Sequence, residues 1–138
     1  MKKRCVLVIL LCFWGLLLSA CNRTETEQSV LEGVRTAPVV KLEFAEHADN
    51  TPIFVDNVGT TISIADMRIQ ASDHAFDEEW LYRFTYNPQE KVIDGQEIVL
   101  LFGQSSMGID GVTYLPEEGA EYASILEWAE GVYNYYNQ

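Results

Sequence analysis

Residues 97–116 read EIVLLFGQSSMGIDGVTYLP, and this stretch predicts the centre of a β-sheet. Its opening run, 97–102, is apolar on both faces of an extended chain, which suits a central strand covered from above and below. Further on, Asp110-Gly111 lies between apolar residues, and such a pair is the strongest short-range signal for a hairpin turn. We therefore expect one strand near 98–102, followed by a hairpin built from 107–109 and 112–115.

The segment that follows this hairpin has the pattern of an amphipathic helix. Pro116 closes the hairpin, and Glu117, Glu118 and Glu121 then stand where the N-terminus of a helix favours negative charge. Apolar residues recur at helical spacing: Tyr122, Ile125, Leu126, Ala129, Val132, Tyr133 and Tyr136. The pattern predicts a C-terminal helix of about 16 residues that packs one face on a sheet.

Strand patterns also precede the hairpin. In 80–86 the aromatic residues Trp80, Tyr82, Phe84 and Tyr86 share one face of an extended chain, and Arg83 and Thr85 lie on the other. In 39–44 apolar residues at 40, 42 and 44 share one face in the same way. Residues 62–71 fit either short strands or a helix, and 72–79 read as an acidic loop. The chain is thus predicted to be an α+β protein: an antiparallel meander of four to six strands with the C-terminal amphipathic helix on one face.

The N-terminus has the three parts of an export signal. Lys2, Lys3 and Arg4 precede an apolar run over 5–18, and small residues then lead to Cys21. The run has about 14 residues, whereas a spanning helix needs about 20. Leu18-Ser19-Ala20-Cys21 resembles the lipobox of bacterial lipoproteins, which implies cleavage before Cys21 and a diacylglycerol on its thiol. An uncut membrane helix, or an ordinary signal with an incidental cysteine, is the alternative.

These features divide the chain into three parts. We expect a lipoprotein signal peptide at 1–20, a lipidated Cys21 with a flexible polar tether at 21–36, and one globular α+β domain at 37–138. The expected location is the extracytoplasmic face of the cell membrane, where lipid on Cys21 anchors the protein. Cys5 and Cys12 lie within the signal, so the mature chain keeps only Cys21 and forms no internal disulfide.

The charge of the chain is strongly negative. The signal segment carries three of the nine basic residues and none of the 21 acidic ones, so the remaining chain has six basic residues and a formal charge of −15. Nucleic acid is not an expected partner, because phosphate contacts need a basic patch. An acidic field instead speeds encounter with positively charged surfaces, and we expect a basic protein or peptide as partner.

Few residues stand out as a binding surface. Acidic side chains gather at Asp73, Asp77, Glu78 and Glu79, and Trp128 and Tyr135 share a stripe beside the apolar face of the C-terminal helix. The only histidines, His47 and His74, lie in polar segments, where exposed loop side chains are expected. With a carboxylate they would form a metal site only if their loops converged. We predict no catalytic residues, no metal and no cofactor.

The sequence best fits a non-catalytic binding or interaction domain held at the membrane. It contains no nucleophile elbow and no phosphate-cradling loop before a helix. A ligand or metal sensor domain is one alternative, and a small envelope hydrolase without a recognisable motif is another. A pocket of converging polar groups would distinguish these from a flat interaction surface.

Overall fold

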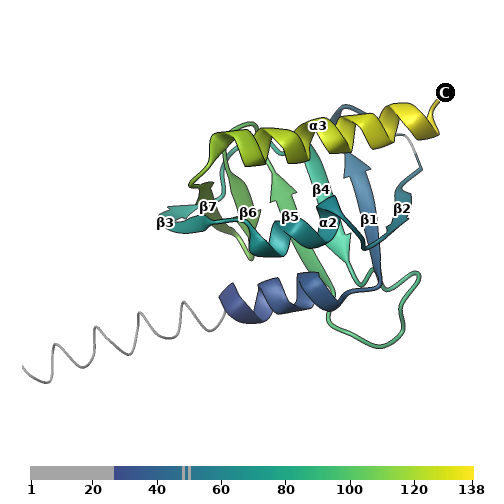
Figure 1. The fold of residues 1–138 in the computed structure, drawn as a ribbon, viewed down its shortest axis with the longest axis horizontal. Coiled ribbons are helices and arrows are strands. Elements are labelled where there is room, and N and C mark those ends of the chain that lie inside the picture. Colours follow the sequence, from purple (N-terminus) through teal and green to yellow (C-terminus); the bar gives the residue numbers. More distant parts are fainter. Residues whose placement is uncertain (1–26, 48, 50) are drawn as a thin grey trace, which may run out of the picture.

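A seven-stranded antiparallel sheet with helices on one face forms the protein (Figure 1). The computed structural model describes residues 27–47, 49 and 51–138. It confirms the α+β class and the C-terminal helix packed on the sheet. Within these residues the sheet has one strand more than the upper end of the expected range.

The strands occur in a simple order along the chain. They are β1 (Val39–Phe44), β2 (Ile53–Asp56), β3 (Ile69–Ala75), β4 (Tyr82–Tyr86), β5 (Ile98–Phe102), β6 (Met107–Ile109) and β7 (Val112–Pro116). Across the sheet the order is β2-β1-β4-β5-β6-β7-β3. The strands from β4 to β7 form the predicted meander, while β1 and β3 extend it on opposite sides.

The hairpin between β6 and β7 forms where the sequence predicts it. Asp110 and Gly111 both have positive φ angles, 49° and 77°, and Ile109 faces Val112 across the two-residue turn. Positive φ at both central positions matches the right-handed twist of the flanking strands. The turn therefore fixes the register, which places Met107 opposite Tyr114.

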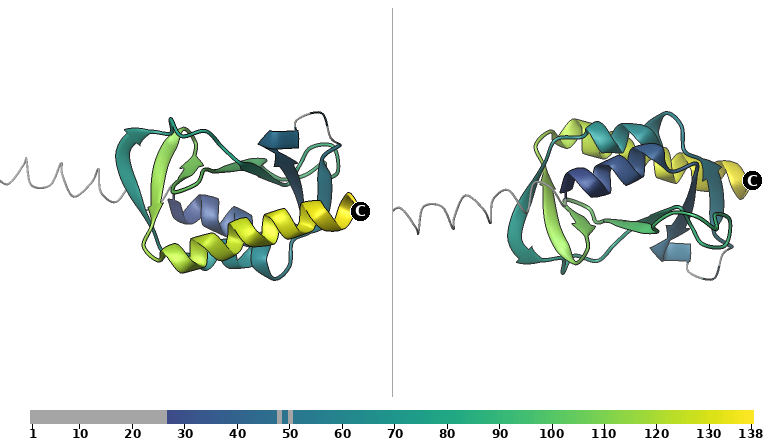
Figure 2. Two further views of the ribbon diagram at one scale, coloured as in Figure 1. Left: turned by 90° about the horizontal axis from the view of Figure 1, so that it is seen from above. Right: turned by 90° about the horizontal axis from the view of Figure 1, so that it is seen from below.

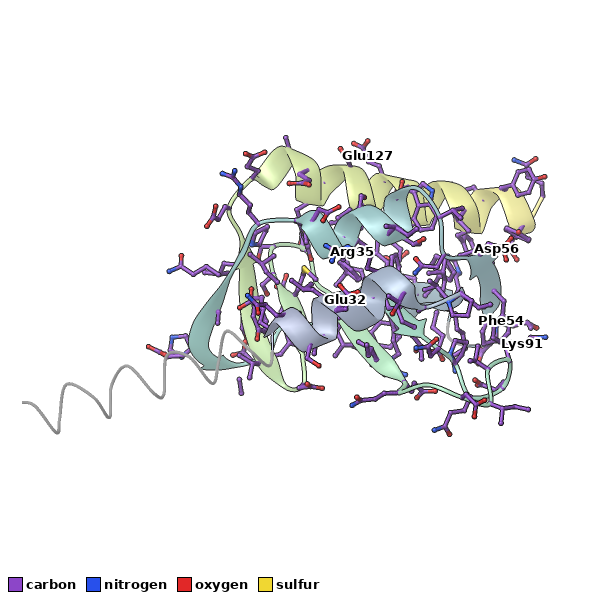
Figure 3. All side chains as sticks on the ribbon, turned by 60° about the horizontal axis from the view of Figure 1, so that its bottom comes forward. Glu32, Arg35, Phe54, Asp56, Lys91 and Glu127 are labelled. Carbon is purple, nitrogen blue, oxygen red and sulfur yellow. The ribbon has the colours of Figure 1, made fainter. Side chains whose placement is uncertain are left out.

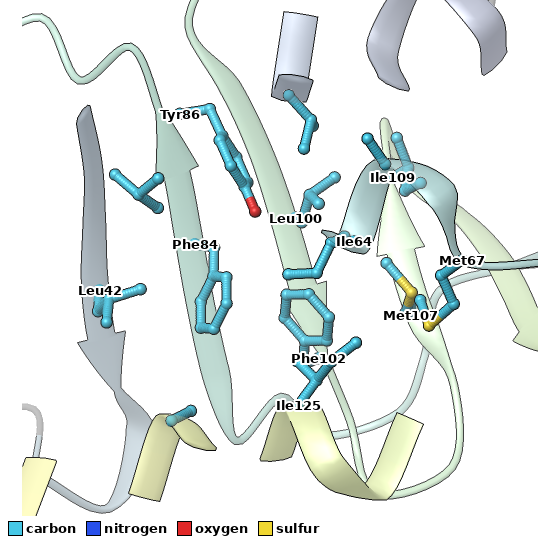
Figure 4. Close-up of a cluster of buried hydrophobic side chains, with 14 of the residues drawn as sticks. Leu42, Ile64, Met67, Phe84, Tyr86, Leu100, Phe102, Met107, Ile109 and Ile125 are labelled. Carbon is cyan, nitrogen blue, oxygen red and sulfur yellow. The ribbon is translucent and has the colours of Figure 1, made fainter. Parts of the chain in front are cut away.

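The core lies between the sheet and the helices (Figure 4). Alternate residues of the central strands point to this side, as expected from the period of two in a strand. The buried strand residues are Val40, Leu42, Phe44, Ile53, Phe84, Tyr86, Leu100, Phe102, Met107, Ile109 and Tyr114. Phe84 contacts Phe102 with ring centroids 4.6 Å apart, and this pair lies near the middle of the layer.

The helices lie together on one side of the sheet in both views of Figure 2. They are a helix over 27–36, η1 (Ala45–His47), α2 (Thr60–Ser63), η2 (Ile64–Asp66) and α3 (Gly119–Tyr136). Helix α3 has 18 residues and buries Tyr122, Ile125 and Ala129. The predicted C-terminal helix is thus confirmed, with its apolar stripe on the sheet.

The two readings of 62–71 are both partly correct. The chain is helical through Asp66, where Ile64 and Ala65 enter the core, and then becomes strand β3 from Ile69. The expected acidic loop over 72–79 is wrong in its first half, because 72–75 continue β3, whose pairing with β7 is irregular after Ala71 and resumes with Ala75 opposite Val112. This strand lies at the edge of the sheet and is largely exposed beyond residue 72, so its polar residues leave no apolar alternation in the sequence.

The expected flexible tether over 21–36 is corrected by the helix over 27–36. Val34 is fully buried in the core, and the Asn57 amide donates hydrogen bonds to the carbonyl oxygens of Val34 and Ala37 at 2.6 and 2.7 Å. A buried amide that satisfies the last carbonyls of a helix holds that helix in place. The folded domain therefore includes 27–36, whereas Cys21 lies outside the described residues.

An ion pair on the surface also connects this helix to the rest of the domain. Arg35 donates to Asp66 at 2.8 Å and to Glu32 at 2.9 Å, and Figure 3 shows Arg35 and Glu32 on the same helix. Both acidic partners are more than half exposed, so solvent screens the pairs and they add little to stability. Burial of Val34 is the larger contribution to holding the helix.

Replacing Val34 by alanine tests whether this helix belongs to the fold. Removing two buried methyl groups should lower the free energy of unfolding by about 2 kcal/mol. Ser29→Ala, at an exposed position of the same helix, should change it by less than about 0.5 kcal/mol. Urea denaturation of both variants measures the difference, and equal small effects would show that 27–36 does not pack on the domain.

Candidate functional site

A small cavity opens where the C-terminal half of α3 crosses the ends of β1 and β4. Its volume is about 250 Å³. The lining residues come from β1, η1, the start of β4 with the residue before it, and α3: Phe44, Glu46, His47, Leu81, Tyr82, Glu130, Tyr133 and Asn134. A second hollow beside β2 has no charged residue in its lining. The first cavity therefore combines enclosure with charge, and we take it as the candidate site.

Aromatic rings form the walls of this cavity. Phe44 is 7% exposed and contacts Tyr82 edge-on, with ring centroids 5.7 Å apart. Tyr133 lies 5.0 Å from Phe44 and carries the His47 ring stacked nearly parallel at 4.0 Å. Because each ring packs against another, the walls hold their shape without a ligand.

Two carboxylates give the cavity a negative field. Glu46 comes from η1 and Glu130 from α3, so they reach the cavity from different elements. Burial raises the pKa of the Tyr82 hydroxyl, and the nearby Glu130 and Glu46 carboxylates raise it further. In the described part of the chain, neither glutamate forms an ion pair. The site thus presents apolar faces and unneutralised negative charge together.

We expected Asp73, Asp77, Glu78 and Glu79 to form an acidic surface, and this expectation is wrong for Glu78. Its carboxylate accepts hydrogen bonds from the Ser105 backbone N–H at 2.9 Å and from the Ser106 hydroxyl. Burial raises the pKa of Glu78, but the hydrogen bonds from Ser106, Ser105 and Gln104 outweigh it and hold the pKa below its ordinary value. Glu78 is therefore a structural anchor, while the other three acids are exposed.

Glycine at position 103 leaves room for the Glu78 side chain. A β-carbon there would lie 2.5 Å from the Glu78 carboxyl carbon, closer than real contacts allow. The same turn is held from the other side by Tyr122 of α3, whose hydroxyl lies 2.6 Å from the Gly103 carbonyl oxygen and 2.8 Å from that of Ser106. The turn between β5 and β6 is thus held between the segment before β4 and helix α3.

We expected Trp128 and Tyr135 to form an exposed pair on α3, and this expectation is wrong for Trp128. Its ring lies 6.0 Å from Phe84, edge to face, and packs against the core. Tyr135 is 72% exposed, as expected, and contacts Tyr136. Trp128 belongs to the packed face because α3 lies flat on the central strands, which brings its flanking stripe over Phe84. The pair therefore does not form a common surface.

The two histidines have different environments. His47 lines the cavity and stacks on Tyr133, whereas His74 is exposed on edge strand β3. Within residues 27–47, 49 and 51–138, no three His, Cys, Asp or Glu side chains come together in an arrangement that could hold a metal ion. None of the helices there combines the length and apolar character needed to cross a bilayer.

Sequence reasoning missed the cavity itself. Of its lining residues, the sequence suggests His47 as a metal ligand, whereas Phe44, Tyr82 and Tyr133 fit the apolar faces of the predicted strands and helix. The residues come from separate segments that approach only after α3 packs across β1. Comparison of the chain with protein-family models, curated proteins and solved structures gave no match. Inference about function therefore depends on the geometry of the site and on the N-terminal motif.

The Glu78 anchor predicts a pH-dependent stability. A folded-state pKa below the unfolded value of about 4.3 means that ionised Glu78 stabilises the fold above that pH, and that this contribution is lost as pH falls through the folded pKa. Glu78→Gln should lower the free energy of unfolding at pH 7 by about 1–2 kcal/mol. The deficit should shrink as the pH falls below about 4.

Glu79→Gln is the matched control, because Glu79 is exposed and one residue away. Urea denaturation at pH 7 and at pH 3.5 measures both variants. A deficit for Glu78→Gln that stays constant with pH would assign its effect to shape and not to charge.

Proposed function

We propose that this protein is a lipid-anchored, extracytoplasmic binding domain that recognises a basic protein or peptide without catalysing a reaction. The observation that carries the proposal is the cavity in which Glu46 and Glu130 lie beside aromatic rings and form no ion pair with any residue that the structure describes. A chain with a formal charge of −15 after its signal segment adds a long-range field of the same sign. Such a field steers positively charged partners toward the domain.

The position of the cavity supports access from outside the membrane. Figure 1 places the start of helix 27–36 and the C-terminal end of α3 at opposite ends of the domain. Five residues separate Cys21 from this helix, and a chain of that length spans at most roughly 20 Å. With lipid on Cys21, the domain stays close to the bilayer, and the cavity lies at the end away from the anchor.

The chemistry of the site favours binding over hydrolysis. A hydrolase of the serine type needs a hydroxyl nucleophile beside a base. No serine lines the cavity, and Ser105 and Ser106 are hydrogen-bonded to Glu78 elsewhere. The His47 ring stacks on Tyr133 and forms part of the cavity wall. These features support recognition as the role of the site.

The anchor is tested by replacing Cys21 with serine. The variant should lose incorporation of labelled palmitate and leave the membrane fraction, because the thiol is the atom that would carry the lipid. Palmitate labelling followed by fractionation of washed membranes measures both effects. A variant that remains membrane-bound after a high-salt wash would place the anchor in an uncut apolar segment at 5–18.

Site-specific photo-crosslinking in intact cells tests the binding role. A benzophenone amino acid at Asn134, on the rim of the cavity, should form an adduct with a basic protein or peptide. The same probe at Glu121 of α3, which does not line the cavity, should not form this adduct. An acidic partner, or equal adducts at both positions, would contradict the proposal.

A further inference from the structure

We propose that the cavity binds a primary ammonium group of the kind that a lysine side chain presents, held between the aromatic rings of Phe44, Tyr82 and Tyr133 and the carboxylates of Glu46 and Glu130. The inference rests on the proposed binding function for its partner and goes further by naming the recognised group. The choice of an ammonium group follows from the aromatic residues in the cavity wall, the placement of the two carboxylates and the volume of the cavity.

The aromatic walls favour a cation attached to an alkyl stem. Tyr82 and Tyr133 each pack against Phe44, with ring centroids 5.7 and 5.0 Å from it, so the orientation of the three rings is set before binding. An ammonium within about 6 Å of such rings is attracted to their negative faces, and the methylene groups behind it pack on the same surface. Fixed walls also reduce the conformational entropy lost when the ligand binds.

The carboxylates favour an ammonium with N–H groups over other cations. Glu46 and Glu130 approach from η1 and α3, two separate elements, and both act on the Tyr82 hydroxyl. A primary ammonium has three donors that point in different directions, whereas the guanidinium of arginine presents a planar fork suited to one carboxylate. A quaternary ammonium has no N–H to donate. Two carboxylates on separate elements therefore fit the primary ammonium group of a lysine side chain best.

The volume limits the ligand to a side chain. Pockets for drug-sized ligands measure about 300–1,000 Å³, and this cavity has about 250 Å³. A single extended side chain with a charged tip fills such a space, and the rest of the partner would remain on the surrounding acidic surface. Anionic groups are disfavoured, because the described lining holds two carboxylates and no lysine or arginine.

The test is a titration of the full-length chain in neutral maltoside micelles, observed by NMR. The probe is the tripeptide Ala-Lys-Ala with an acetylated N-terminus and an amidated C-terminus. We expect saturable chemical-shift changes at Tyr82 and Tyr133, and at least tenfold weaker binding of the same peptide acetylated on the lysine side chain. Equal binding of both peptides, or changes confined to other residues, would overturn the proposal.

Two charge variants separate the site from the general field. Glu130→Gln should weaken the lysine peptide about tenfold, whereas Glu121→Gln, nine residues earlier on the same helix, removes the same charge and should have little effect. Both positions are exposed, so the fold should persist. Equal weakening of peptide binding by the two variants would overturn the proposed ammonium site, because net charge alone would then explain the binding.

The result of the peptide titration does not depend on the proposed lipid anchor at Cys21. Loss of palmitate labelling at Cys21 would overturn the proposed location without changing peptide binding. Failure of the lysine peptide, with labelling and crosslinking intact, would overturn only the ammonium site.

Discussion

The arrangement of this protein depends on burying one face of its antiparallel sheet. Leu42, Phe84, Leu100 and Phe102 place large apolar side chains on that face, and a sheet can keep only its other face in water. Helix α3, the helix over 27–36 and the short turns of α2 and η2 together cover it. The N-terminal helix is needed because α3 spans only one side of the layer in Figure 1. This requirement explains why a polar segment with three apolar residues folds against the core.

Polar hydrogen bonds at the edges of the core fix how the helices lie. The Asn57 amide holds the end of helix 27–36, and the Tyr86 hydroxyl donates to the Thr61 carbonyl oxygen of α2. On the other side, Tyr122 and Glu78 hold the turn between β5 and β6 from two directions. Apolar contacts alone allow helices to slide, whereas buried hydrogen bonds cost free energy when they are displaced. The angle of α3 across the strands is set by these contacts.

That angle produces the candidate site. Because α3 begins at the β5–β6 turn and runs across β4 toward β1, its last turns extend over the ends of these strands, where Phe44 and Tyr82 stand. Tyr133 and Glu130 then face residues of η1, and a cavity with aromatic walls and two carboxylates results. The acidic character of the chain thus recurs here, against apolar surface. The proposed recognition of a basic side chain would use, at this one site, the negative charge that the whole chain carries.

The sequence alone determined the features that depend on neighbouring residues. Alternation in 80–86, the Asp110-Gly111 turn and the helical spacing of 122–136 each specify local structure, and they predict the α+β class. The lipobox-like pattern at Leu18–Cys21 is equally local, and the lipid anchor that it predicts stays a prediction. Tertiary structure decided the rest: that Val34 is core, that Glu78 points inward, that Trp128 packs on Phe84, and that η1 meets α3 around a cavity. These outcomes require residues far apart in sequence to meet. The periodicity of a segment shows which of its faces is apolar but not which distant residue will contact it. A binding site made between elements becomes visible only when those elements are packed.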